Sequence, residues 1–577
     1  MKHPFTLMRS LLLTGLLLGK SGLEAAHAQA PAWQTATAVA TASNGVYTVT
    51  ASAPDATGTN LYVTGSFTGT VAMGGALLTS AGATDVFVGK WNVATQRFAW
   101  VQRAGGPNND QALALTVRGA VVFLAGTFGG AASFGTVGLT AAGATDGFVA
   151  KLGDAGTSAA FVWAQAVGGL NEDRATALDV SGASVYLTGT FRSQTATLGR
   201  LTLTNPTAGA TTAGLAHIFL TKLTDAGPTA AFVWARAFGG NAADDAAAAL
   251  AASGSSVYLA GDYTGNLNLG GGTTLSSAGG RDAYVLKFTD GGTNAALAWA
   301  KSAGGTSADL AQALAVSGTS VYVAGAFGGF AIFDLNAVVS AGPANAFVAK
   351  LTDAGPGSTF TWVQQAGGTA TDLATALAVS GSSVYVAGAF TSPAATFGTI
   401  SLANSSGATA RTADVFVTRL TDSGPASTFG WAQKAGGPGP DAAATVAVLG
   451  STLYVGGSAT PPATFGSQAI TAANTASVGF LAALAAGPLA TADAVALAGL
   501  SLSPNPAHGT ATVQLPAGLG TAPATLTVLD ALGRPVRTQT ASTNARAEMD
   551  LTGLAPGLYA VRVQAGGSTA SQRLVVE

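Results

Sequence analysis

Short runs of alternating apolar and small residues recur along the chain between about residues 31 and 488. The run from Ser383 to Phe390 is representative, with Val384, Tyr385 and Val386 followed by small residues and the phenylalanine. Valine, tyrosine and phenylalanine in such runs, separated by turns rich in glycine and aspartate, are typical of short β-strands. The pattern predicts consecutive β units, each of about four strands.

Three series of anchor residues give these units their period. Each series has seven members, and the tryptophan anchors recur at spacings of 63 to 71 residues. The tryptophan anchors are Trp33, Trp100, Trp163, Trp234, Trp299, Trp362 and Trp431. The anchors of a second strand are Tyr62, Phe123, Tyr186, Tyr258, Tyr322, Tyr385 and Tyr454, and those of a third strand are Phe87, Phe148, Phe219, Tyr284, Phe347, Phe416 and Phe480. In the first six repeats a lysine or arginine follows the third anchor by three residues, and the sequence therefore predicts seven repeats.

The repeat region begins and ends at different strands of its repeat. The first repeat begins at its tryptophan strand, at Trp33, and the last ends at its phenylalanine strand, at Phe480. Elsewhere these two strands adjoin through a hairpin, so a meeting of the two ends would rebuild the hairpin and close a ring without open sheet edges. This match predicts a seven-bladed β-propeller, with an open β-solenoid as the alternative.

The amino-acid composition excludes several classes of function. Of 577 residues, 78 are glycine and 9% are charged, and the net charge of −2 excludes a polybasic surface for nucleic acid or anionic membranes. The absence of cysteine excludes disulfides, thiolate catalysis and cysteine metal sites, and four histidines leave little for histidine metal sites. We therefore expect no cofactor, no metal and no nucleic-acid partner, with calcium as the alternative left open.

The N-terminus has the features of a secretory signal peptide. Lys2 and Arg9 precede a short apolar run, and small-x-small cleavage sites follow, the first formed by Ala26 and Ala28. The run is shorter than the ~20 residues that a membrane span needs. We expect a Sec signal peptide over residues 1–28 and no transmembrane segment elsewhere.

A composite motif recurs in the repeats. It consists of a Trp-x-x-x-x-Gly-Gly-x-x-x-Asp run, a Val-Tyr-Val-x-Gly-x-Phe strand, a Phe-Gly element and a Gly-x-x-Asp-x-Phe-Val-x-Lys strand. The segments 362–372, 384–390, 397–398 and 146–151 show it well. In these motifs, residues 31–488 resemble the bacterial β-propeller repeats called SBBP repeats. The resemblance implies a propeller fold and almost nothing about a ligand.

An aspartate follows the Gly-Gly pair in six repeats. In a closed ring these carboxylates would lie at one height, where they would bind a cation at the channel mouth. Alternatively, each caps backbone N–H groups of its own turn, which is the hypothesis we favour. The residues are Asp110, Asp173, Asp244, Asp309, Asp372 and Asp441. A second series precedes glycine and is interpreted as hairpin-turn residues: Asp154, Asp225, Asp290, Asp353 and Asp422.

Two repeats are longer than the others between the second and third anchors. That distance is 25 or 26 residues in five repeats, 33 in the third and 31 in the sixth. The extra polar residues form equivalent loops that would lie almost across the ring from each other. Because rigid scaffolds commonly carry function on loops, these are the candidate binding loops, with neutral variation in length as the alternative. The candidate residues are Asn205, Thr207, Thr211, Asn404, Ser405 and Arg411.

No catalytic constellation is evident. Glutamates of the expected mature chain are few, and no Gly-x-Ser-x-Gly nucleophile elbow occurs. His217 stands where other repeats have aspartate and is interpreted as a surface substitution. We expect no catalytic residues; the alternative is an extracellular polymer-degrading hydrolase or lyase.

Residues 499–577 follow a linker over residues 489–498 and lack the repeat anchors. About seven short runs separated by glycine and proline turns predict a small Ig-like β-sandwich. In the order and spacing of its motifs and in its terminal position, this module resembles the type A C-terminal sorting domain of the type IX (Por) secretion system. The matching residues are Pro504, Asn505, Pro506, Asp530, Gly533, Leu554, Gly557, Tyr559, Val561 and Leu574.

The expected protein is all-β: a seven-bladed β-propeller over residues 29–488, followed by the sorting sandwich. The resemblance of the C-terminal module implies a partner in the type IX machinery and passage across the outer membrane to an extracellular or cell-surface location. The expected function is non-catalytic binding or adhesion, with a polysaccharide, a cell surface or a protein as the ligand.

Overall fold

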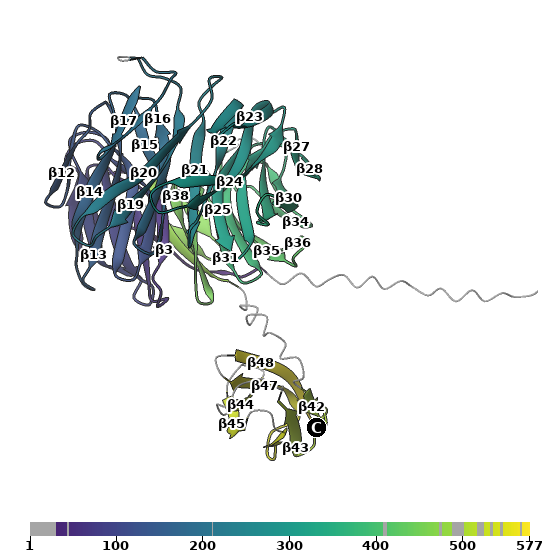
Figure 1. Ribbon diagram of the computed structural model, residues 1–577. Coiled ribbons are helices and arrows are strands. Elements are labelled where there is room, and N and C mark those ends of the chain that lie inside the picture. The colour runs from purple at the N-terminus through teal and green to yellow at the C-terminus, as the bar shows by residue number, and fades with distance from the viewer. Residues whose placement is uncertain are drawn as a thin grey trace, which may run out of the picture.

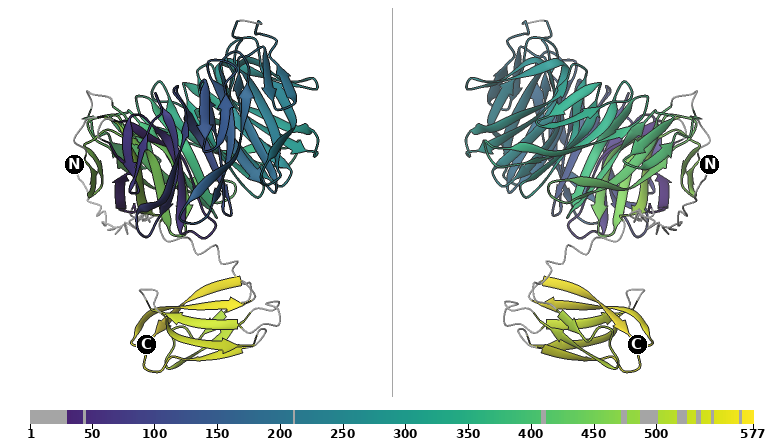
Figure 2. Two further views of the ribbon diagram at one scale, coloured as in Figure 1. Left: turned by 90° about the vertical axis from the view of Figure 1, so that its left-hand side faces the viewer. Right: turned by 90° about the vertical axis from the view of Figure 1, so that its right-hand side faces the viewer.

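The computed structural model describes residues 30–42, 45–209, 212–407, 412–471, 476–486, 501–515, 524–530, 535–542, 546–565 and 568–577. The chain is all-β over these ranges. In Figures 1 and 2, strands β1–β41 form one body and strands β42–β48 form a second. No helix in the described part of the chain is long and apolar enough to span a membrane. The expected signal peptide with Ala26 and Ala28, and the expected linker 489–498, lie outside the described residues.

The described strands of the first body group into seven antiparallel units of four strands, each listed from the innermost strand outwards. Unit 1 has β3 (Tyr47–Pro54), β4 (Asn60–Phe67), β7 (Asp85–Asn92) and β8 (Arg97–Gly105). Unit 2 has β9 (Gln111–Arg118), β10 (Val121–Phe128), β13 (Asp146–Asp154) and β14 (Ala159–Gly168). Unit 3 has β15 (Asp173–Ser181), β16 (Ser184–Phe191), β19 (His217–Asp225) and β20 (Ala230–Phe238). Unit 4 has β21 (Ala246–Ser253), β22 (Ser256–Gly270), β23 (Thr273–Asp290) and β24 (Ala295–Gly305).

The remaining units follow the same order. Unit 5 has β25 (Asp309–Ser317), β26 (Ser320–Phe327), β29 (Asn345–Thr352) and β30 (Thr359–Gly367). Unit 6 has β31 (Asp372–Ser380), β32 (Ser383–Phe390), β35 (Asp414–Asp422) and β36 (Ser427–Ala435). Unit 7 has β37 (Ala442–Leu449), β38 (Thr452–Ala459), β41 (Val478–Ala485) and, from the N-terminal end of the repeat region, β1 (Trp33–Ala38).

The units close into a ring. The innermost strands β3, β9, β15, β21, β25, β31 and β37 contact one another in this order, and β37 contacts β3. Strand β1 pairs antiparallel with β41, with Ala38 opposite Phe480, so segments far apart in sequence complete unit 7. This is the pairing of chain ends that the sequence predicts.

The register of β1 corrects one anchor. Trp33 lies opposite Leu484, and Thr35 lies opposite Ala483. In unit 2, Phe161 lies opposite Leu152 and Trp163 lies opposite Lys151. Trp33 therefore occupies the position of Phe161, and Thr35 occupies the tryptophan position, so the assignment of Trp33 to the tryptophan series was wrong by two residues.

Short hairpins between the second and third strands were not foreseen in the count of four strands. They are β5 (Thr70–Met73) with β6 (Ala76–Thr79), β11 (Ala131–Phe134) with β12 (Val137–Thr140), β17 (Thr195–Leu198) with β18 (Leu201–Thr204), β27 (Phe330–Phe333) with β28 (Asn336–Val339), β33 (Ala394–Phe397) with β34 (Ile400–Ala403), and β39 (Ala463–Phe465) with β40 (Gln468–Ile470). In units 2, 3, 5 and 6 the hairpin pairs with the outermost strand of the preceding unit. Strand β2 (Thr41–Ala42) pairs with β5.

The apolar core lies between neighbouring units. One cluster joins Tyr322, Val348 and Trp362 of unit 5 with Val384 and Phe416 of unit 6, all nearly inaccessible to solvent. Alanine and glycine elsewhere on these faces let the units approach closely, as core packing at crystal-like density requires.

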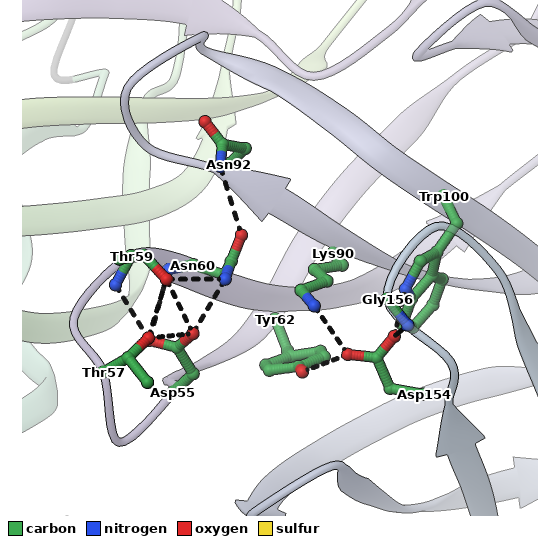
Figure 3. A network of polar contacts seen from close by, with 10 residues as sticks. All are labelled: Asp55, Thr57, Thr59, Asn60, Tyr62, Lys90, Asn92, Trp100, Asp154 and Gly156. Atoms are coloured by element: carbon green, nitrogen blue, oxygen red, sulfur yellow. Dashed lines mark hydrogen bonds and ion pairs between the residues drawn. The ribbon is translucent and has the colours of Figure 1, made fainter.

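A shared carboxylate, here called the junction aspartate, links neighbouring units. Asp154 of unit 2 accepts hydrogen bonds from three groups of unit 1: Tyr62 Oη at 2.6 Å, Lys90 Nζ at 2.7 Å and Trp100 Nε1 at 2.8 Å. Figure 3 shows the three donors converging on its two oxygens. The turn residue thus also satisfies the polar ends of side chains whose bodies are buried.

The same arrangement recurs at four further junctions. Asp290, Asp353 and Asp422 each bind a tyrosine, a lysine and a tryptophan of the preceding unit, and Asp225 binds Lys151 and Trp163, with Phe123 in the tyrosine position. Burial alone raises the pKa of Asp353, but the hydrogen bonds from Lys287, Tyr258 and Trp299 outweigh it and lower the pKa to about 2. The junction aspartates are therefore charged at neutral pH.

The second body consists of two antiparallel sheets over the described residues. One contains β42 (Ser501–Ser503), β43 (Thr510–Gln514) and β46 (Arg546–Asp550); the other contains β45 (Pro535–Ala541), β44 (Ala524–Leu529), β47 (Gly557–Ala565) and β48 (Ser568–Val576). Leu526, Val528, Val561 and Leu574 belong to a core that both sheets share with Val513.

The junction geometry predicts the effect of removing one tryptophan. Trp299 is 6% exposed, and its Nε1 donates to Asp353 at 2.9 Å. We expect Trp299→Ala to lower the free energy of unfolding by ~3–5 kcal/mol, because it leaves a cavity and an unpaired acceptor. Trp299→Phe, the matched control, keeps a ring and loses the hydrogen bond, so we expect about 1–3 kcal/mol. Urea denaturation measures both; an unchanged midpoint for Trp299→Ala would refute the inter-unit packing.

Candidate functional site

The antiparallel order of the strands places two kinds of loop at the same end of the ring. The Gly-Gly loops lead from the outermost strand of one unit to the innermost strand of the next, and the two insertions connect a second strand to a third. We call this end the insertion face. The junction aspartates, at the C-terminal ends of the third strands, lie at the opposite end. Candidate binding loops and the Gly-Gly aspartates therefore share one face.

The two insertion loops are built on the same asparagine turn. Asn205 is fully buried; its Nδ2 donates to the carbonyls of Phe191 and Leu215, and its Oδ1 accepts from the N–H and hydroxyl of Thr207. Asn404 makes the equivalent bonds in unit 6, donating to Phe390 and Thr412 and accepting from Ser406. Both asparagines hold the base of a loop and are not themselves presented to a ligand.

The other candidates on these loops differ in their contacts. Thr207 Oγ1 accepts the N–H of Leu215 at 3.0 Å, so it also braces its loop. Ser405 donates its backbone N–H to Asp414 Oδ2 and accepts Lys434 Nζ at 2.9 Å on its hydroxyl, which places Lys434 beside this loop. Thr211 and Arg411 lie outside the described residues.

The Gly-Gly aspartates cap backbone groups. Asp110 accepts the N–H groups of Gly106 at 2.7 Å and Gly129 at 3.1 Å. Asp173, Asp309, Asp372 and Asp441 make equivalent bonds, with serine hydroxyls added in two of them. All five are at most 1% exposed. These contacts are those of the capping hypothesis, and they leave the carboxylates inside their turns rather than around an open channel mouth.

In the fourth repeat the capping aspartate is Asp245, not the predicted Asp244. Gly240 donates its N–H to Asp245 Oδ2 at 2.7 Å, and Asp245 is 1% exposed. Asp244 instead pairs with Arg192 and accepts the N–H of Ala216. This loop is one residue longer than the others, so counting from the Gly-Gly pair selected the wrong member of an Asp-Asp sequence.

The cavity at the centre of the ring is lined by uncharged residues. A cavity of about 250 Å³ runs between the seven innermost strands, and its lining residues are alanine, leucine, valine, threonine, serine and glutamine. Thr50, Thr176 and Thr375 donate their hydroxyls to carbonyls of the next innermost strand at 2.6 to 2.7 Å. The residues that line this cavity are therefore not ionisable. Asp179, also on β15, accepts the Thr116 hydroxyl and the Ala252 N–H from the two neighbouring innermost strands.

A second hollow of about 520 Å³ lies on the insertion face between units 1 and 2. It is lined by Gly105, Gly106, Ser133, Thr140 and Arg103 among others. Arg103 is the one charged residue among its lining residues, and its Nη1 pairs with Asp85 Oδ2 at 2.6 Å. The described residues contain no group of three or more histidine, aspartate or glutamate side chains placed to hold a metal ion.

A second set of buried carboxyls lies beside the Gly-Gly loops. Three of them begin third strands, and Asp282 holds the equivalent register within the longer β23. Asp85, Asp146, Asp282 and Asp414 each accept a backbone N–H on one oxygen, while the other oxygen has no hydrogen-bond partner. Arg103 and Lys434 lie near Asp85 and Asp414. Asp146 and Asp282 have no such cation; Ala166 and Ser302 stand at the equivalent positions.

Units 3 and 5 have a different residue, His217 or Asn345, at the position of these buried aspartates. His217 is 5% exposed, and its Nε2 donates to the carbonyl of Gly240 at 3.0 Å, so its interpretation as a surface substitution was wrong. With its amide oriented to satisfy both atoms, Asn345 donates from Nδ2 to the carbonyl of Gly368 at 2.9 Å. Each therefore donates to the second glycine of a Gly-Gly pair, which sequence spacing could not reveal.

The comparisons with known proteins concern the two bodies separately. Residues 501–577 match the family model of the secretion system C-terminal sorting domain, Por_Secre_tail. This domain supports export by type IX secretion, interaction with its machinery and an extracellular or cell-surface location. No curated protein matches the chain.

Similar solved structures include two sialidases of Trypanosoma rangeli. One, in complex with sialic acid, is 10% identical, with 82% of this chain and 84% of that chain covered and a TM-score of 0.31. The other, a mutant displaying trans-sialidase activity, is 10% identical, with 94% and 87% covered and a TM-score of 0.30. Similarity at this level carries no argument about the activity of this chain.

The residues of the sorting motif lie in the second body. Asn505 Nδ2 donates to the carbonyl of Arg573 at 2.7 Å and its Oδ1 accepts the N–H of Val575, so the opening turn, with Pro504 and Pro506, is tied to the last strand. Val561 and Leu574 are core residues, Leu554 and Tyr559 pack against them, and Tyr559 Oη donates to Ala555. Asp530 and Gly557 lie at strand ends, and Gly533 lies outside the described residues.

The buried carboxyls predict a pH dependence at the insertion face. Asp282 faces Asp309 and the neutral Tyr263; burial raises the pKa of Asp282, and burial raises that of Asp309 to about 7. Because Asp309 already accepts two N–H groups, we expect the proton shared by this pair to reside on Asp282, where it can donate as Asn345 does. Burial likewise raises the pKa of Asp146, which faces Asp173, to about 6.

A raised pKa means that the folded chain holds protons that the unfolded chain releases near pH 4. This stabilisation is complete below about pH 4 and is lost as the pH rises through about 6 to 7. We expect Asp146→Asn and Asp282→Asn each to raise the free energy of unfolding at pH 8 by roughly 1–3 kcal/mol and to flatten its decline from pH 5. Asn345→Asp, the matched reverse change, should steepen that decline. Denaturation from pH 4 to 8 measures all three; destabilisation by both asparagine variants at pH 8 would contradict the protonated state.

Proposed function

We propose that the protein is a secreted or cell-surface β-propeller exported by the type IX system, with the seven four-stranded units as its blades and the C-terminal body as an Ig-like sandwich. The match of residues 501–577 to the sorting domain carries the export part of the proposal. The ring contacts of the innermost strands support the propeller part. In this proposal the blades are SBBP-type repeats and the N-terminus is a Sec signal peptide.

We further propose that the ring acts as a non-catalytic binding or adhesion module for a polysaccharide, a cell surface or a protein. The supporting observation is that the ionisable side chains described above already have structural partners. The aspartates described above are engaged in junctions, turn caps or buried carboxyl pairs, and the channel lining is neutral. The insertion loops are additions to the repeat that the junctions do not require, which favours them as the ligand-binding elements.

Deletion of residues 499–577 tests the export route. We expect the truncated chain to be processed at its signal peptide and to accumulate in the periplasm, because the element that addresses the type IX machinery is gone. Fractionation and immunoblotting against a periplasmic marker measure this. Appearance of the truncated chain outside the cell would refute the assigned role of the C-terminal domain.

Exchange of the insertion loops tests the binding role. In unit 2 the equivalent connection is residues 141–145, so replacing residues 205–216 and 404–413 with that sequence removes both insertions and keeps the strand ends. Replacing residues 340–344 of unit 5, which have the same length, is the matched control. On a glycan and polysaccharide screen with the mature chain, with and without calcium, we expect at least a tenfold loss of binding for the double exchange and none for the control. Product formation from a bound polymer would instead favour the enzyme alternative.

A further inference from the structure

The junction between units 6 and 7 keeps the donors of the other junctions. Tyr385 lies opposite Arg419, and Arg419 lies opposite Trp431. At the preceding junction the register is the same, with Tyr322 opposite Lys350 and Lys350 opposite Trp362. A tyrosine, a cation and a tryptophan are therefore placed as in the sites that hold Asp154, Asp290, Asp353 and Asp422.

The carboxylate is missing from this junction. Asp422 donates its backbone N–H to Ser382, and Ala486 makes the same bond to Ser451, so Ala486 occupies the position of the junction aspartate. A methyl group stands where five other junctions carry a carboxylate. Tyr385 Oη turns to the carbonyl of Ala486 at 3.0 Å.

The two remaining donors are left without an anion. Trp431 is 2% exposed, and its Nε1 has no hydrogen-bond partner among the described residues. Arg419 donates from Nε to Ser383 Oγ at 2.9 Å, and no carboxylate of the described residues lies within ion-pair distance of its guanidinium. A buried N–H without an acceptor is unfavourable, and a bound anion would relieve that cost.

The junction between units 7 and 1 also lacks the aspartate, but it differs in its donors. Val93 takes the place of the aspartate, since its N–H donates to Thr59 as the junction aspartates donate to their neighbours. Ala483 takes the place of the lysine, and Thr35 takes that of the tryptophan. Where the acid is lost there, the cation and the buried indole are lost with it. Units 6 and 7 lose the acid alone.

We propose that the junction between units 6 and 7 is a binding site for a carboxylate group supplied by a ligand, held by the Trp431 Nε1–H and the Arg419 guanidinium. The ligand supplies the carboxylate that Ala486 lacks, so it presents a single unbranched carboxylate, free or at the end of an acidic side chain. An indole N–H binds the carboxylate at the other junctions, as Trp362 does. A guanidinium, which replaces the lysine here, pairs strongly with carboxylates.

The carboxylate has two sources, a free acid or an acidic residue of the same chain. Asp493 follows Ala486 by seven positions in the sequence and lies outside the described residues. Formate and acetate serve as probes for the free acid, with chloride at equal ionic strength as the control anion. Asp493→Asn distinguishes the two sources.

Thermal denaturation of the mature full-length chain tests the site. If the site is open in the wild type, we expect formate to raise the thermal midpoint of the wild type. If Asp493 fills the site, we expect formate to raise the thermal midpoint of Asp493→Asn instead. In either case the increase should saturate with formate concentration. Trp431→Phe keeps the ring and loses the N–H, and we expect it to weaken formate binding about tenfold. Ala486→Asp restores the missing acid; we expect a midpoint above that of the wild type and no further response to formate.

Two results would overturn the proposal. The first is the absence of a formate or acetate response in both the wild type and Asp493→Asn. The second is an equal response in Ala486→Asp and the wild type, which would place the anion elsewhere. Arg419→Gln provides an independent variant, because Arg419 is only half-buried, and an unchanged formate response in it would also contradict the site.

Discussion

The shared carboxylate, present at five of the seven unit junctions, is the interaction that aligns those units in the ring. Neighbouring units meet through alanine, glycine and valine, which pack closely but fix no register. The buried tryptophan and tyrosine bring polar ends that need partners, and a lysine beside them needs a counterion. One aspartate from the next unit satisfies all three, as Asp353 does for Trp299, Tyr258 and Lys287. A chain with 9% charged residues thus uses its charges to align its sheets.

The two ends of the ring treat the same residue type in opposite ways. At the junction end, donors surround each aspartate and hold its pKa below the ordinary value, so acid removes this stabilisation as the carboxylates are protonated. At the insertion face, burial without a cation raises the pKa of Asp146 and Asp309. The pKa shifts at the two ends therefore have opposite signs, so alkali weakens the insertion face and acid weakens the junctions.

The sequence allowed the repeat period, the β class and the meeting of Trp33 and Phe480 strands to be predicted, because each rests on spacing along one chain. The errors arose where spacing is ambiguous. Trp33 substitutes for a phenylalanine two positions from the tryptophan site, and Asp244 precedes the true cap Asp245. His217 and the outer hairpins were missed because their contacts lie in a neighbouring loop or unit, which no local pattern encodes. The Asp154 series was recognised as turns, but its donors are 54 to 104 residues away in sequence, beyond any local rule.

A repeated structure supplies its own controls for function. A residue that recurs at equivalent positions, such as the junction aspartate, is explained by the architecture, and departures from the repeat are where a separate role has to be sought. The insertion loops depart in length, and the junction at Ala486 departs by losing an acid while keeping its donors. The junction at Val93 shows that the fold tolerates removal of the acid, the cation and the indole together, while Tyr454 remains. Because closure of the ring does not require Arg419 and Trp431 to remain polar there, their retention is the stronger indication that something outside the described repeat uses them.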